Sequence, residues 1–123
     1  MNYNKKVMDY FLHPKNMGEL DKPDGEGQVG NPVCGDVMKV QIKVKADHIS
    51  DIKFKTLGCA AAIASSSALT ELAKGKTLKQ AEMITRDDVV KELGGLPTEK
   101  VHCSVLAQEA LKKAIKNYKN KSL

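Results

Sequence analysis

The feature that most constrains the fold is a regular alternation of apolar and polar residues between positions 37 and 45. The apolar positions are Met38, Val40, Ile42 and Val44. Successive side chains of a strand point to opposite faces of the sheet, so this segment predicts a strand with one face in water. Such strands are typical of antiparallel sheets covered on one side only. A second alternating segment, 52–56, follows the polar stretch ADHIS (46–50), which predicts the connecting turn.

Helical periodicity begins at Cys59, and the alanine-rich segment that follows ends at Gly75. The clearest helix is the last one, whose apolar stripe consists of Ala107, Ala110, Leu111, Ala114, Ile115 and Tyr118. Thr77 with Gln80 resembles a capping box for a short helix, and Thr85 predicts the start of another.

The N-terminal part is predicted to hold a short amphipathic helix at 4–13. Residues 15–35 are rich in Gly, Pro, Asp and Asn, which predicts mostly loop with only a short strand around Gln28–Val29. The order of helix, strands and then helices predicts an α+β fold in a single domain, 1–123. We expect a small antiparallel sheet that helices cover on one face.

Composition and charge narrow the classes of function. The net charge is +5, and lysines crowd the C-terminal end of the chain. No aromatic platform accompanies them, so we interpret them as a solvated helix face and expect no nucleic-acid partner. No segment approaches the roughly 20 apolar residues that span a bilayer, and the N-terminus does not read as a signal peptide. We therefore expect a cytoplasmic protein without a membrane partner.

The chain contains three cysteines, an odd number that argues against a disulfide framework. Cys34 lies in the loop before the first alternating strand, Cys59 where strand gives way to helix, and Cys103 near the start of the last helix. The exposed N–H groups of a helix N-terminus favour the thiolate, so we expect lowered thiol pKa values at Cys59 and Cys103. A thiolate is the form that binds metal or attacks sulfur.

Asp36 and His102 lie close in sequence to these cysteines, and both are metal-ligand residue types. Three sulfurs with one or two nitrogen or oxygen donors suit Zn²⁺ or iron–sulfur chemistry, and do not suit Mg²⁺ or Ca²⁺. The alternative is that the cysteines are three small buried hydrophobic residues. Gly35 should let the loop between Cys34 and Asp36 rearrange.

Three segments resemble the signature segments of IscU/NifU-type iron–sulfur cluster assembly scaffolds. They are GNPVCGD (30–36), LGCAAAIASSS (57–67) and LPTEKVHCSVLAQEAL (96–111), to which HPKNMG (13–18) adds a fourth match. The amino-acid sequences of the second and third segments are similar to those in the N-terminal scaffold domain of NifU. The resemblance covers nearly the whole chain.

The resemblance implies that three cysteine loops converge at one end of the fold and build a transient [2Fe–2S] cluster there. Sulfur would come from a cysteine desulfurase as a persulfide, with Fe²⁺ as the metal and an electron donor such as a ferredoxin. The cluster would pass to apo iron–sulfur proteins, with Hsp70/Hsp40-type chaperones as further partners. Such a protein is a scaffold and carrier, not an enzyme.

Carried over by motif, the residues expected to hold the cluster are Cys34, Cys59, Cys103, Asp36 and His102. The last two are the exchangeable donors, and Cys103 is the expected persulfide acceptor. Zn²⁺ is a further possible occupant of the apo site. The residues that match the chaperone-recognition segment are Leu96, Pro97 and Lys100. Thr98 and Glu99 depart from that segment, because the IscU form has Pro and Val there.

The main alternative is a zinc-dependent sulfur shuttle of SufU type. That branch carries an extra segment between the second and third cysteines and a basic residue where this chain has His102. Here only 43 residues separate Cys59 from Cys103, which leaves no room for the insertion. A thiol enzyme using Cys103 with His102 and a structural zinc module are weaker alternatives.

Overall fold

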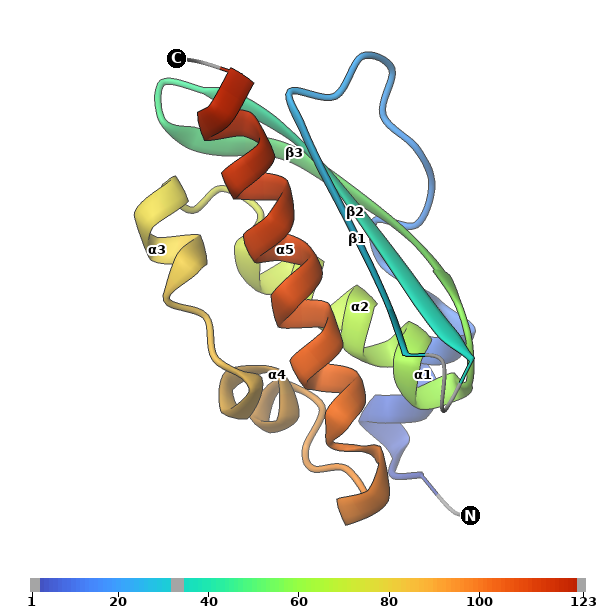
Figure 1. The fold of residues 1–123 in the computed structure, drawn as a ribbon. Helices are drawn as coiled ribbons and strands as arrows, with labels where there is room; N and C mark the ends of the chain where they lie inside the picture. The colour runs from blue at the N-terminus through green and yellow to red at the C-terminus, as the bar shows by residue number, and fades with distance from the viewer. Residues whose placement is uncertain (1–2, 32–34, 122–123) are drawn as a thin grey trace.

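The computed structural model describes residues 3–31 and 35–121. Its elements are α1 (Lys5–Leu12), β1 (Gly25–Asn31), β2 (Asp36–Lys45), β3 (His48–Leu57), α2 (Ala60–Ala73), α3 (Leu78–Glu82), α4 (Arg86–Glu92), the 3₁₀ turn η1 (Thr98–Lys100) and α5 (His102–Lys121). The described strands form one antiparallel sheet in the order β1-β2-β3 (Figure 1).

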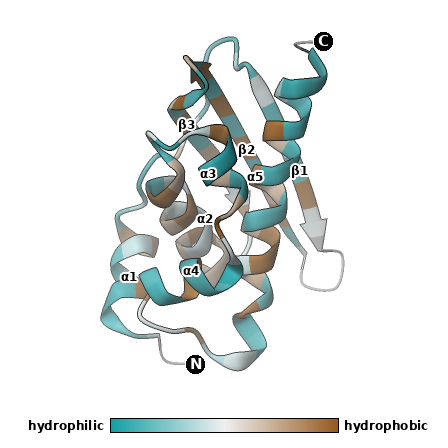
Figure 2. Ribbon diagram, turned by 90° about the vertical axis from the view of Figure 1, so that its left-hand side faces the viewer, coloured by the Kyte–Doolittle hydropathy of each residue, from teal (hydrophilic) through white to brown (hydrophobic). Residues whose placement is uncertain are grey.

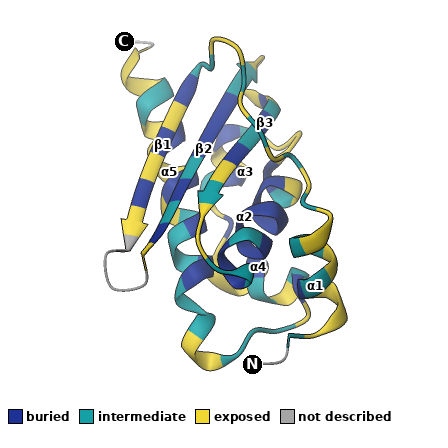
Figure 3. Cartoon of the chain, turned by 90° about the vertical axis from the view of Figure 1, so that its right-hand side faces the viewer, coloured by how far each residue is buried: buried dark blue, intermediate teal, exposed yellow. Residues whose placement is uncertain are grey.

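The helices gather on one face of the sheet. The long helix α5 runs along β1 and β2, and α2 packs against β3 (Figure 1). Figure 3 shows the sheet from the other side, where buried and exposed residues alternate along the strands. The predicted α+β fold, with an antiparallel sheet covered by helices on one face, is therefore confirmed.

The core lies between the sheet and the helices. Met38, Val40 and Ile42 of β2 are at most 1% exposed, as their alternation predicted. The stripe predicted on α5 is also buried from Ala107 to Ile115. Val44 is only half-buried, because it lies at a bulge near the end of its strand. Hydrophilic residues dominate the last turns of α5, where the helix faces water (Figure 2).

Strand β1 is a correction to the sequence prediction, which placed mostly loop at 15–35. Its seven residues pair with β2 from Gly25 opposite Ile42 to Asn31 opposite Asp36. The glycines that led to the loop prediction allow β1 to pack closely against α5. A Cβ on Gly25 or Gly27 would collide with backbone oxygens of that helix. Glycine in a strand often marks such a close approach of two backbones.

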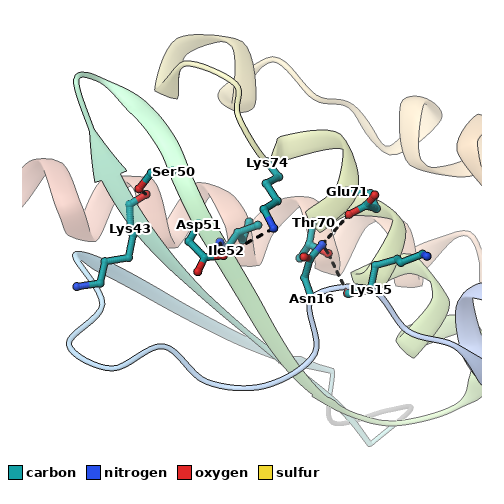
Figure 4. A network of polar contacts seen from close by, with 9 residues as sticks. All are labelled: Lys15, Asn16, Lys43, Ser50, Asp51, Ile52, Thr70, Glu71 and Lys74. Atoms are coloured by element: carbon teal, nitrogen blue, oxygen red, sulfur yellow. Dashed lines mark hydrogen bonds and ion pairs between the residues drawn. The ribbon is translucent and has the colours of Figure 1, made fainter.

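The segment between α1 and β1 is anchored to α2 and to the edge of β3 that does not pair with β2. Asn16 has a positive φ of 63°, and its side-chain amide donates to Thr70 Oγ1 at 3.1 Å and to Glu71 Oε2 at 2.9 Å (Figure 4). The amide of Phe54 donates to Asn16 O at 2.9 Å. The HPKNMG segment therefore docks the N-terminal part of the chain onto the α2–β3 layer.

The β2–β3 connection is shorter than predicted. Only Ala46 and Asp47 form the turn, both with positive φ, and His48 already belongs to β3. The pairing then slips by one residue, which leaves Ser50 unpaired as a β-bulge. The Ser50 hydroxyl donates to Lys43 O at 3.2 Å (Figure 4).

The short helices begin where their caps predicted. Thr77 and Gln80 form a complete capping box at the start of α3. Thr85 forms another with Asp88 at the start of α4. None of the helices in the described ranges is long and apolar enough to cross a membrane.

Candidate metal and cluster site

Asp36 is the first residue of β2 and lies on its core face. It precedes Met38 and Val40 on the buried side of the alternation, and only 2% of its surface is exposed. This face normally carries apolar side chains, since a buried carboxylate is costly without a partner. Cys103 Sγ lies 3.7 Å from Asp36 Oδ2 and is placed to donate to it.

Cys59 occupies the N-cap position of α2. Its backbone is extended, and its side chain makes no capping hydrogen bond with the helix. The thiol is half-buried, and Lys100 Nζ lies 3.8 Å from its sulfur. The sulfur of Cys59 therefore lies between a lysine ammonium and the N-terminus of a 14-residue helix.

Cys103 is the second residue of α5 and is fully buried. Burial raises the pKa of its thiol above the ordinary value of 9.0, and the negative charges of Cys59 and Asp36 add to the rise. The expectation that a helix start would lower this pKa is therefore wrong for Cys103. The N-terminal dipole is outweighed because the thiol sits among other anionic groups and away from water.

The three side chains converge. The ligand atoms of Asp36, Cys59 and Cys103 all lie within 4.8 Å of one another, from the starts of β2, α2 and α5. Two sulfurs beside one carboxylate oxygen form a mostly soft donor set, which fits Zn²⁺ or iron–sulfur chemistry better than Mg²⁺ or Ca²⁺. Cys34, the third predicted cysteine ligand, lies outside the described residues.

His102 lies at the edge of this group. Its Nε2 is 3.7 Å from Cys103 Sγ, although it is not among the three residues whose ligand atoms converge. Gly35 precedes Asp36 with a φ of 74° and no other atom within 4 Å of a Cβ built on it. That left-handed conformation favours glycine.

Of the predicted chaperone-recognition residues, Lys100 lies at the site. Leu96 packs against the core, Pro97 caps η1, and Lys100 ends that turn with its ammonium near Cys59. Thr98 and Glu99, where the segment departs from the IscU form, are exposed.

A comparison with protein families settles the relationship. The model of the NifU-like N terminal domain matches residues 2–123. The chain belongs to the NifU-like N-terminal domain family. The resemblance to IscU/NifU-type scaffolds, predicted from its motifs, is thereby confirmed.

Individual relatives agree with this assignment. The NifU-like chain is 58% identical over 120 residues to iron–sulfur cluster assembly scaffold protein IscU 1 of Archaeoglobus fulgidus, covering 98% of this chain and 78% of that protein. It is 52% identical over 125 residues to the scaffold protein IscU of Azotobacter vinelandii, covering 98% and 97%.

Solved structures share the fold. A crystal structure described as an iron–sulfur cluster assembly scaffold protein for the SUF system, from Fervidobacterium islandicum, superposes with a TM-score of 0.78 at 25% identity, covering 92% of this chain and 96% of that one. The N-terminal part of a NifU-like protein from Brucella abortus gives a TM-score of 0.78 at 21% identity, covering 96% and 94%.

The NifU-like site includes residues that the sequence did not single out for it. Lys100 was expected only in chaperone recognition, yet it reaches Cys59. Tyr3 lies near the site, and its pKa is raised by partial burial and then by the charge of Cys59. Gly58 lies against the Asp36 carboxylate. The position of Gly58 beside Cys59 was the available signal in the sequence. A glycine before a helix is more readily interpreted as a flexible joint.

Proposed function

We propose that this chain is a scaffold for iron–sulfur cluster assembly and a carrier, not an enzyme. It accepts sulfur from a cysteine desulfurase, binds Fe²⁺ and builds a transient [2Fe–2S] cluster that passes to apo-proteins. The proposal is supported by relatives that are named as such scaffolds. It is also supported by the Asp36–Cys59–Cys103 group at the meeting point of three elements.

The observation that carries the proposal is the carboxylate among the sulfurs. A protein that stores a cluster needs a closed set of matched soft ligands. A scaffold must release its cargo, so one weak ligand is useful. Asp36 is an oxygen donor placed 3.7 Å from a thiol, and an oxygen donor is poorly matched to iron in a sulfur cluster. Ligand exchange can therefore begin at Asp36.

Sulfur transfer follows from thiol chemistry. The Cys103 thiolate attacks the outer sulfur of the desulfurase persulfide, a new S–S bond forms on Cys103, and the desulfurase cysteine leaves as a thiolate. Converting that sulfur to sulfide needs two electrons, which the proposal assigns to a donor such as a ferredoxin. Cys103 is fully buried, so the start of α5 has to open before transfer.

The segment from Leu96 to Lys100 is proposed to bind an Hsp70/Hsp40-type chaperone. Because the Lys100 ammonium lies 3.8 Å from Cys59 Sγ, capture of this segment would withdraw a positive charge from the site. Chaperone binding and cluster release would then be coupled through one side chain.

The test is anaerobic incubation of the chain with desulfurase, cysteine, Fe²⁺ and reductant. We expect the visible absorption spectrum of a [2Fe–2S] centre, which the Cys34/Cys59/Cys103→Ala variant should not develop. Mass spectrometry should then show persulfide lost in Cys103→Ser and retained in Cys34→Ser and Cys59→Ser.

Persulfide without a cluster would instead favour a zinc-dependent sulfur shuttle of SufU type. Persulfide that survives Cys103→Ser would move the acceptor role to another cysteine.

A further inference from the structure

Gly58 directly follows the last residue of β3 and lies opposite Asp36, the first residue of β2. The pairing of β2 with β3 ends at Val37 opposite Leu57, and Asp36 and Gly58 occupy the next position along both chains. Directly opposite residues of an antiparallel pair point to the same face. The missing side chain of Gly58 would therefore lie on the core side, where the Asp36 carboxylate lies.

The contacts show that the carboxylate occupies that space. A Cβ built on Gly58 would collide with Asp36 Oδ1, and would lie 2.9 Å from Asp36 Cγ and 3.2 Å from Ala62 Cβ. Ala62 belongs to the first turn of α2 and is fully buried, so it has little room to yield. The carboxylate is the group that would have to move.

Backbone conformation does not explain this glycine. The described glycines with positive φ are Gly18, Gly35, Gly75, Gly94 and Gly95. Gly58 is not among them, so alanine could adopt its backbone conformation. The residue is also exposed, and the contact that a Cβ there would make with α2, 3.2 Å from Ala62 Cβ, is tight but less severe than its collision with the carboxylate. The stronger constraint on position 58 is the contact with Asp36.

We propose that Gly58 is a positioning residue for the metal site. Its lack of a side chain lets the Asp36 carboxylate lie against the backbone at position 58, with Oδ2 3.7 Å from Cys103 Sγ. The ligand atoms of Asp36, Cys59 and Cys103 then lie within 4.8 Å of one another. A methyl group at position 58 displaces the carboxylate from the two sulfurs. The consequence for metal binding rests on the proposed function of this site, whereas the steric relation does not.

The experiment is a double-mutant cycle on Zn²⁺ affinity, measured by chelator competition in the wild type, Gly58→Ala, Asp36→Ala and the double variant. We expect Gly58→Ala to weaken Zn²⁺ binding by about tenfold, the lower end of what loss of a supporting residue costs a metal site. In the Asp36→Ala background the same change should weaken it by less than twofold, since no carboxylate remains to be displaced.

Gly30→Ala is the matched control. Gly30 also lacks a positive φ, and a Cβ on it meets no atom closer than 3.5 Å, so its Zn²⁺ affinity should equal that of the wild type. Melting temperatures of the metal-free variants follow folding separately. Gly58→Ala should melt below the wild type, and adding Asp36→Ala should return the double variant to the melting temperature of Asp36→Ala.

Three outcomes would overturn the proposal. These are equal Zn²⁺ affinity in all four proteins, an equal loss from Gly58→Ala in both backgrounds, and a double variant that melts below Asp36→Ala or does not fold. If Gly58→Ala alone fails to fold and the double variant folds, the steric relation is supported. Cluster assembly is not part of this cycle, so its failure on the wild type would count against the proposed function alone.

Discussion

At the scale of single residues, Asp36 shows a direct conflict between folding and chemistry. Its position on the core face of β2 would stabilise the protein more with an apolar side chain, yet it carries a carboxylate that is 2% exposed. A thiol at 3.7 Å offsets only part of that cost. Such a residue is retained when function requires it, and the proposed role is that of the weakest ligand of the cargo.

We predict that Asp36→Ala still acquires a cluster but releases it more slowly. Three thiolates remain to hold it, and an acceptor protein then has no easily displaced oxygen ligand at which to begin. Transfer to an apo-ferredoxin, measured per loaded cluster by visible circular dichroism, should slow by about tenfold, the effect of about 1.4 kcal/mol on the barrier. Transfer at the wild-type rate from a fully loaded variant would remove Asp36 from the mechanism.

The raised pKa of Cys103 predicts how the free energy of unfolding of the metal-free protein depends on pH. Its thiol pKa is raised above the ordinary 9.0, so above about pH 9 the unfolded chain loses a proton that the folded chain keeps. The free energy of unfolding should therefore be insensitive to this group below about pH 8. It should fall at higher pH, by up to about 1.4 kcal/mol per pH unit. Urea denaturation at pH 8, 9 and 10 measures the fall.

The matched variant for that experiment is Cys103→Ala, whose stability should decline less over the same range. Burial and a hydrogen bond to Glu92 also raise the pKa of Tyr10. This group lowers the free energy of unfolding only above about pH 10. Tyr10→Phe separates the two groups. An equal decline with and without Cys103 would show that its pKa is not raised.

At the scale of elements, periodicity predicted the helices and the β2–β3 pair, because both depend on local patterns. It did not predict β1, because the glycines at 25 and 27 are explained only by the approach of α5, a helix some 80 residues later in the chain. The strand is defined by a long-range contact, and a local pattern carries no record of that contact.

The site shows the same division. Cys59, Cys103 and Asp36 could be found from residue type and position at element ends. The pairing of Asp36 with Gly58 could not, since it depends on the bulge at Ser50. Without that extra residue the count from the Ala46–Asp47 turn would place Leu57 opposite Asp36. A one-residue slip changes which side chains share a face.

The packing of β1 on α5 predicts that Gly27→Ala is strongly destabilising. The added Cβ would collide with the α5 backbone at Ala110 and lie 2.5 Å from Ala114 N, so the helix has to shift. Overpacking of this kind costs about 1–3 kcal/mol. The urea midpoint of the metal-free protein should fall accordingly, whereas Gly30→Ala in the same strand should leave it within about 0.5 kcal/mol of the wild type. Equal midpoints for the two variants would contradict the close approach of strand and helix.

At the scale of the whole molecule, the site joins parts of the chain that are distant in sequence. Asp36, Cys59 and Cys103 begin β2, α2 and α5, and these three elements hold most of the core between them. A metal ion bound by all three would connect both layers of the fold. The unfolded chain has no such arrangement, so metal binding should appear as folding stability.

We therefore predict that the protein purified in air carries about one Zn²⁺ per chain, since thiolates and a carboxylate are both ligands of this ion. Removing the ion with a chelator should lower the melting temperature by about ten degrees. An ion in hundredfold excess over its dissociation constant contributes about 2.7 kcal/mol, and each kcal/mol shifts the melting temperature of a domain this size by several degrees. Calorimetry and elemental analysis give both quantities.

The Cys34/Cys59/Cys103→Ala variant should contain no zinc and should melt at one temperature with or without chelator. Zinc content equal to that of the wild type in this variant would place the ion elsewhere on the molecule.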